Sequence, residues 1–153
     1  MRRQAGFTIV EVLVVVVIIG VLATLILPSV KLNTVRVKMS EAILAFAPCR
    51  LAVSEIYQGG GDPPADGVWG CEIAKDASQY VDQVKVDDLG KITISLRAAL
   101  DPRVNTLELT MQPIDNTGSA ASGNGAPLRS WRCGSFADGS QVPIQFLPST
   151  CRG

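Results

Sequence analysis

Four cysteines and no histidine limit the chemistry that this 153-residue chain can do. The cysteines are Cys49, Cys71, Cys133 and Cys151, and no two of them form a Cys-x-x-Cys pair. The spacing therefore gives no sign of a zinc site or of a thioredoxin-like redox pair. In a domain outside the cytoplasm an even number of cysteines is typical of disulfide bonds, and four cysteines allow three pairings.

No group of residues predicts an enzyme. Without histidine, a nucleophile would need another base, and no serine lies in a Gly-x-Ser-x-Gly turn. Carboxylates gather at Asp62 and Asp66 and again at Asp87 and Asp88, but without the spacing of a calcium loop. We interpret them as solvated turn residues, and we expect no catalytic residue, no metal and no cofactor.

The charge balance argues against direct binding to nucleic acid. Lysine and arginine total 14, as do aspartate and glutamate, so the formal net charge is zero. A strongly basic patch is the usual electrostatic footprint of a nucleic-acid binder. The length suits one domain with an appendage.

Glu11 is a carboxylate inside an apolar run near the N-terminus. Residues 12–30 carry no charge, and these 19 positions nearly reach the roughly 20 that a membrane-spanning helix needs. A charged side chain at the centre of a bilayer costs roughly 2.5–3.5 kcal/mol, so it is rarely kept without a role. The simplest alternative to such a role is that Glu11 lies near the end of the span and its side chain extends to the membrane surface.

Arg2 and Arg3 precede the apolar run, and this asymmetry places the polar remainder of the chain outside the cytoplasm. A cleaved secretory signal is less suitable, because its apolar region is usually about 7–15 residues long and ends at a small-x-small site. A plain signal-anchor helix is the other alternative.

The stretch Gly6, Phe7, Thr8, Ile9, Val10 and Glu11, followed by the long apolar run, resembles the class III signal of type IV pilins and related pseudopilins. The resemblance implies that a membrane prepilin peptidase cuts after Gly6 and methylates the new N-terminus at Phe7. Residues 1–6 are then a leader, and residues 7–30 form a transmembrane helix that later enters a filament core. It also implies that Glu11 attracts the methylated amine of Phe7 in an adjacent subunit.

Pro28 matches a proline of that family. The resemblance implies that residues 20–28 can lose helical structure in the filament. Gly20 and Thr24 are poor helix formers, so the sequence is compatible with such local melting. A static kink is the alternative.

Beyond the apolar run, residues 31–58 continue as an amphipathic helix. Their apolar residues recur at intervals of three and four, as one helical stripe requires. This stripe consists of Leu32, Val35, Met39, Ile43, Phe46, Cys49, Val53 and Ile56. We expect one helix over residues 7–58 with a bend at Pro48, ended by three glycines at 59–61.

Four segments with strand character follow a loop at 59–78. Residues 80–86, 91–96, 106–112 and 128–134 are the expected strands, and residues 116–125 are a further loop. We predict an α+β fold, in which the long helix packs on a four-stranded antiparallel sheet. Residues 31–153 form this globular headgroup, which is also the architecture of the type IV pilins.

For the cysteines we favour the pairs Cys133–Cys151 and Cys49–Cys71. The resemblance supports the first, because type IV pilins tie the last strand to the C-terminal tail in this way. The second joins the long helix to the loop after it, and Cys49 lies on the apolar stripe. Buried free thiols are the alternative. In the family the loop closed by the first pair is linked to adhesion and to subunit contacts.

The expected function is that of a structural major subunit of a type IV pilus. It resides in the inner membrane, in contact with lipid, and then in a surface filament that serves adhesion or twitching motility, DNA uptake or phage reception. The implied partners are other subunits, the prepilin peptidase and methyltransferase, and the inner-membrane assembly platform. The alternatives are a type II secretion pseudopilin, a minor pilin and, more remotely, a membrane-anchored periplasmic binding module. Val30, where the family usually has tyrosine, leaves the subtype open.

Overall fold

The computed structural model describes residues 6–64, 68–123 and 127–153, and the side chains of residues 26–29 also lie outside the description. The chain divides into two compact units, one ending at Thr34 and the other running from Val35 to Gly153. Each unit is considered by itself below.

Two helices replace the single helix that the sequence predicts. Helix α1 spans Ile9–Leu44 and α2 spans Ala47–Gln58. The backbone N–H groups of Ala45 and Phe46 bond to the carbonyls three residues earlier, at 3.1 Å each, so the last turn of α1 is tightened. Pro48 is the cause, because proline has no N–H and its ring clashes with the carbonyl four residues before it. The expected end of the helix at Gln58 is confirmed.

No single described helix is both long and apolar enough to meet the criteria for a membrane span, but the consecutive segments Ile9–Leu25 and Val30–Leu44 meet them together.

The second unit buries one stripe of its helical residues. The stripe contains Val35, Met39, Ala42, Phe46, Cys49, Val53 and Tyr57, all at most 6% exposed. The prediction was wrong at Ile43 and Ile56, which are only half-buried. Ala42 and Tyr57 are buried in their places, at 0% and 1% exposed.

The sheet is confirmed as four antiparallel strands in the order β1-β2-β3-β4. The strands are β1 Val81–Val86, β2 Ile92–Leu96, β3 Glu108–Asp115 and β4 Leu128–Cys133. Strand β3 extends three residues past its predicted end at Gln112. Pro113 cannot donate a hydrogen bond, but its carbonyl accepts the N–H of Ala121 at 2.9 Å, and Ile114 and Asp115 still pair with β4.

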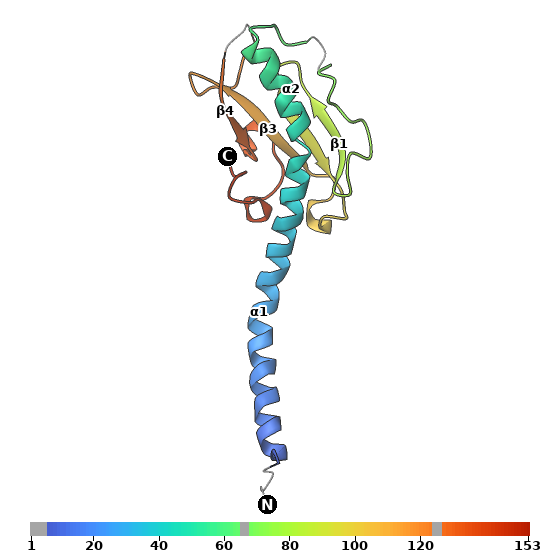
Figure 1. Ribbon diagram of the computed structural model, residues 1–153, viewed down its shortest axis with the longest axis vertical. Coiled ribbons are helices and arrows are strands. Elements are labelled where there is room, and N and C mark those ends of the chain that lie inside the picture. Colours follow the sequence, from blue (N-terminus) through green and yellow to red (C-terminus); the bar gives the residue numbers. More distant parts are fainter. Residues whose placement is uncertain (1–5, 65–67, 124–126) are drawn as a thin grey trace, which may run out of the picture. The chain divides into compact units, whose positions relative to one another are not determined.

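One face of the sheet forms the core of the second unit. Rows across the strands place Val84 opposite Ile94 and Leu109, all at most 1% exposed. Helix α2 lies along this face (Figure 1). The opposite face carries polar residues, of which Gln83, Ser95 and Glu108 form one row. The α+β fold predicted from the sequence is therefore confirmed.

Candidate functional site

The N-terminal end of α1 is shaped by a threonine cap. The hydroxyl of Thr8 accepts the backbone N–H of Glu11 at 3.3 Å, and its carbonyl accepts the N–H of Val12 at 3.3 Å. A threonine followed three residues later by glutamate has the spacing of a capping box. The cap was not predicted from the sequence, although the spacing of Thr8 and Glu11 was sufficient to indicate it.

Glu11 lies in the first turn of α1, and its side chain is exposed. A carboxylate in this turn is favoured by the partial positive charge at the N-terminus of a helix, typically by 0.3–1 kcal/mol. Glu11 also lies close to Phe7 along the chain, and the Phe7 side chain is 81% exposed.

Every large apolar side chain between Phe7 and Leu25 is exposed in the single chain. The exposed fractions run from 49% at Val14 to 86% at Ile9. Burying such a side chain fully is worth about 1.5–3 kcal/mol. The segment therefore presents an apolar surface on every side of the helix, which water does not favour.

Neither Gly6 nor Gly20 is required by packing or backbone within the chain. A Cβ at either position would meet no described atom within 4 Å, and neither glycine has a positive φ. Glycine in a helix interior costs roughly 1 kcal/mol relative to alanine. Gly20 therefore weakens α1 without an internal benefit.

Two parts of the predicted site lie wholly or partly outside the described residues. Residues 1–5 of the expected leader are outside, and so is Asp66 in the acidic loop. Pro28 lies within α1, but nothing is described of its side chain. Residues 20–28 are helical in this structure.

Both favoured disulfide pairings are confirmed. Cys49 bonds to Cys71 and Cys133 bonds to Cys151, with sequence separations of 22 and 18. Cys49 is fully buried on the helical stripe, as its position predicted.

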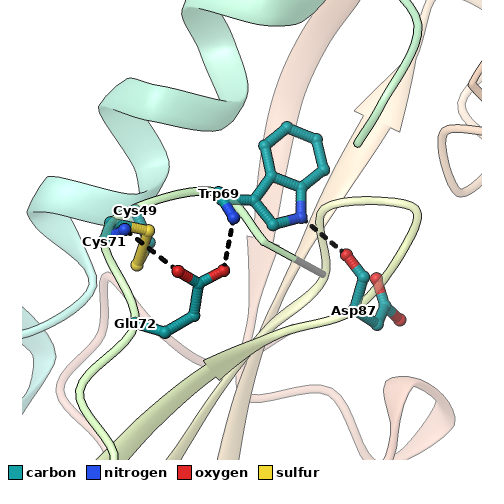
Figure 2. The surroundings of a disulfide bond; sticks show 5 residues. All are labelled: Cys49, Trp69, Cys71, Glu72 and Asp87. Atoms are coloured by element: carbon teal, nitrogen blue, oxygen red, sulfur yellow. Dashed lines mark hydrogen bonds between the residues drawn. A yellow bond between two sulfur atoms is a disulfide. The ribbon is translucent and has the colours of Figure 1, made fainter. Parts of the chain in front are cut away.

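The Cys49–Cys71 bridge is accompanied by a carboxylate clamp that the sequence did not reveal. Figure 2 shows Glu72 accepting the backbone N–H groups of Trp69, at 2.7 Å, and Cys71, at 3.1 Å. The Trp69 indole donates to the carbonyl of Asp87 at 2.8 Å. The disulfide and these hydrogen bonds therefore connect helix α2, the loop that carries Cys71 and the β1–β2 turn. The only available signal was an acidic residue directly after a cysteine in a loop.

Tyr57 joins the same cluster from α2. Its ring stacks on Trp69 with centroids 6.5 Å apart, and its hydroxyl donates to the carbonyl of Leu89 at 2.9 Å. Burial raises the pKa of this phenol above its ordinary value, and the nearby carboxylates of Asp87 and Asp88 act in the same direction.

The loop closed by Cys133–Cys151 is fixed by an ion pair. Arg132 donates to both carboxylate oxygens of Asp138 at 2.6 Å, and the Asp138 side chain is only 7% exposed. Forked arginine–carboxylate pairs of this kind are geometrically specific. The pair also raises the pKa of the Arg132 guanidinium through its hydrogen bond to Asp138.

The same loop needs a glycine and exposes two apolar side chains. Gly134 has φ +77°, and a Cβ there would stand 2.6 Å from the carbonyl oxygen of Cys151. Phe136 and Ile144 are 62% and 53% exposed on this rigid frame. The predicted loop is therefore a well-defined surface.

An apolar helical segment that is exposed on all sides, followed by an α+β domain with two disulfides, is compatible with a class of proteins that are anchored through an N-terminal helix. The comparisons with known proteins identify the family. The description "Pilin (bacterial filament)" matches residues 35–152, and the prokaryotic N-terminal methylation motif matches residues 1–27. The chain belongs to the type IV pilin family.

Relatives extend over nearly the whole chain. It is 33% identical to the fimbrial protein EcpC of Eikenella corrodens over 153 residues, covering 97% of this chain and 91% of the relative. It is 31% identical to a type IV major pilin protein, PilE1, of Neisseria gonorrhoeae, covering 97% and 94%. A probable minor fimbrial protein of Dichelobacter nodosus is 26% identical, with 99% and 97% covered.

Pilins are structural proteins whose subunits polymerise into extracellular filaments. The methylation motif implies processing by a prepilin peptidase, and the apolar N-terminal helix is compatible with membrane anchoring.

Proposed function

We propose that this chain is a structural major subunit of a type IV pilus. It is cut after Gly6, methylated on the amine of Phe7 and polymerised into a surface filament that serves adhesion and twitching motility. The observation that supports this proposal most strongly is the apolar surface of residues 7–25. Every large apolar side chain in this segment is exposed in the single chain. Lipid covers this surface before assembly, and other subunits cover it afterwards.

The proposal assigns three regions to three stages. Residues 1–6 are the leader, residues 7–30 are the membrane and filament-core half of the helix, and residues 31–153 are the headgroup. The inner-membrane assembly platform and the prepilin peptidase act on the first two regions, and the headgroup reaches the filament surface.

Gly6 supports the proposed cleavage point. Neither its backbone conformation nor its surroundings demand glycine, so a requirement for glycine there would come from another molecule. An exposed residue just before α1 is also accessible to a peptidase.

Glu11 is the proposed assembly contact. A carboxylate buried among apolar helices is costly unless it is paired, and a partner charge in the low-dielectric core compensates that cost. The methylated amine of Phe7 in an adjacent subunit is a suitable partner. The cap at Thr8 fixes the backbone that carries the carboxylate, so the pairing also sets the register between subunits.

Gly20 and Pro28 are proposed to serve packing between helices. Small residues let helix backbones approach closely where no water drives association. Since Gly20 has open space around it within the chain, that space is available to a neighbouring helix. Melting of residues 20–28 in the filament remains part of this proposal.

The headgroup helices offer a second contact surface. Val37, Leu44 and Leu51 recur every seven residues and are 71%, 69% and 62% exposed. Val37 and Leu44 are both on α1, where residues seven apart lie on nearly the same side, and Leu51 is exposed on α2. We assign this outer apolar surface to contacts with the apolar segments of other subunits.

A minor pilin is the second candidate. It is favoured by the 26% identity to a probable minor fimbrial protein over 99% of this chain. A minor subunit would be processed in the same way but present in few copies. The quantity of the chain in purified filaments distinguishes the two.

A matched pair of substitutions tests the role of Glu11. Glu11→Gln keeps the shape of the side chain and removes its charge, and Glu41→Gln does the same at an exposed position of α1. We expect both chains to be cleaved after Gly6, but filament yield after shearing to fall at least tenfold only for Glu11→Gln. A normal yield of filaments from Glu11→Gln would contradict the proposed pairing.

A further inference from the structure

The polar face of the sheet, opposite the face that packs on α2, contains an open hollow of about 590 Å³. Its lining includes the row Gln83, Ser95 and Glu108, which runs across β1, β2 and β3, together with Asn105 and Thr106 from the loop before β3. Ligand sites usually occupy about 300–1,000 Å³, so the size suits a small molecule.

The lining keeps hydrogen-bonding capacity that the chain itself does not use. The Gln83 amide donates to the Ser95 hydroxyl at 3.3 Å, and this is the sole side-chain bond recorded for either group within the described residues. The Asn105 amide and the Glu108 carboxylate take part in no side-chain bond among those residues. An amide has four bonding positions and a hydroxyl three, so most of them face solvent.

The cation that the described residues place at the hollow, Arg97, is already paired. Arg97 donates to the carboxylates of Asp76 and of Asp82, the latter at 2.8 Å. The hydrogen bond from Arg97 lowers the pKa of Asp76, so this carboxylate stays ionised and paired in mildly acidic solution. Because one guanidinium balances only one of its two carboxylates, and Glu108 adds a further negative charge, the hollow disfavours an anionic ligand.

Backbone strain also gathers around this hollow. Among the described residues only two that are not glycine have a positive φ, Asp76 at 57° and Thr106 at 61°. Thr106 lines the hollow, and Asp76 holds its arginine. A β-branched residue in this conformation is a real outlier, and such strain tends to cluster at functional sites.

We propose that this hollow binds a neutral saccharide, whose hydroxyl groups bond to Gln83, Ser95, Asn105 and Glu108. Side-chain amides, hydroxyls and a carboxylate supply both donors and acceptors, as a sugar hydroxyl requires. Among the described residues the lining contains no aromatic side chain, and its apolar part comes from Leu96, Ala98 and Ala99. This binding function goes beyond the filament proposal and does not require assembly.

The test uses the full chain in a detergent without sugar groups, observed by saturation-transfer difference NMR. The probes are maltotriose, globotriose and chitotriose as neutral trisaccharides, with sialyllactose as an acidic comparison. We expect at least one neutral probe to bind. Removal of one or two hydrogen bonds by Gln83→Ala or Ser95→Ala should weaken that binding roughly fivefold.

Matched substitutions elsewhere in the same unit provide the controls. Gln145→Ala and Ser130→Ala remove the same groups from exposed side chains that do not line the hollow, and they should change the affinity less than about twofold. Thr106→Gly tests the rim without endangering the fold, because glycine adopts a positive φ freely. It should unfold at a higher temperature than the wild type while binding the neutral probe more weakly.

Three results would overturn the proposal. These are no binding of any neutral probe, tighter binding of sialyllactose than of the neutral probes, or an equal loss in the control variants. Since the chain is unassembled in detergent, each of these results leaves the filament proposal unaffected.

Discussion

The apolar segment 7–25 and the domain from Val35 to Gly153 differ in whether their apolar side chains are buried within the chain. The segment exposes between 49% and 86% of each large apolar side chain, whereas the domain buries Ile92, Ile94 and Leu109 completely. The domain is also cross-linked by two disulfides. The domain is therefore stabilised from within, and the segment depends on another molecule. Substitutions in the two regions should affect different properties.

The largest effect is expected from a charge placed in the apolar segment. Val16→Asp should abolish filaments, because a buried unpaired carboxylate costs several kcal/mol in each subunit contact. Filament yield after shearing measures this loss, and the membrane fraction shows whether the chain is still inserted. Val16→Leu is the matched control and should assemble normally.

Val16→Asp should leave the stability of the domain unchanged. The unfolding free energy of the domain in Val16→Asp should stay within about 0.5 kcal/mol of the wild type, because Val16 does not belong to the second unit. Loss of domain stability in this variant would show that the two regions are energetically coupled.

The next effect concerns the disulfides. Replacing Cys133 and Cys151 by serine should lower the unfolding free energy by about 3 kcal/mol, as expected for a closed loop of this length. Replacing Cys49 and Cys71 should have a similar effect, since that loop differs little in length. Urea unfolding followed by circular dichroism measures both. A loss below about 1 kcal/mol in both pairs would mean that the domain core alone suffices.

A smaller effect is expected at the ion pair in the C-terminal loop. Asp138→Asn removes the negative charge that pairs with Arg132, and the unfolding free energy should fall by about 1–2 kcal/mol. This figure is below that for a fully buried pair, because the Arg132 side chain is 34% exposed. Asp88→Asn, at an exposed turn position, is the control and should be neutral. Equal urea midpoints for the two variants would contradict a stabilising role for the pair.

The smallest effect is a shift in ionisation. Burial raises the pKa of Tyr57 above its usual value of about 10, so the folded domain holds this proton more tightly than the unfolded chain does. The stabilising contribution is therefore complete below pH 10 and is lost as the pH rises through the folded-state pKa. Spectrophotometric titration of the wild type and of Tyr57→Phe isolates the phenol. Ionisation of Tyr57 below its usual value would contradict its burial in the cluster with Trp69.

The sequence was most informative where a pattern is local. The glycines at 59–61 end α2 as expected, and the alternation of residues 91–96 predicted strand β2 to within one residue. The position of Cys49 on the apolar stripe correctly predicted that its side chain is buried. These features depend on neighbours in the chain, so a single sequence carries them.

The sequence was least informative where distant residues decide the outcome. Pro48 was expected to bend one helix but separates two, because its missing N–H and its ring end α1 at Leu44. Glu72 clamps two backbone N–H groups that only the folded loop brings together. The hollow beside Thr106 depends on strand register, which composition does not specify.

The intact mass of this chain in filaments sheared from the cell surface tests processing and assembly in one experiment. We predict a mass that lacks residues 1–6, is raised by one methyl group and is lowered by the hydrogens lost in the two disulfides. That single value would report cleavage, methylation, cross-linking and assembly together. A full-length mass confined to the membrane fraction, with no chain in the sheared filaments, would show that the chain is not a processed filament subunit.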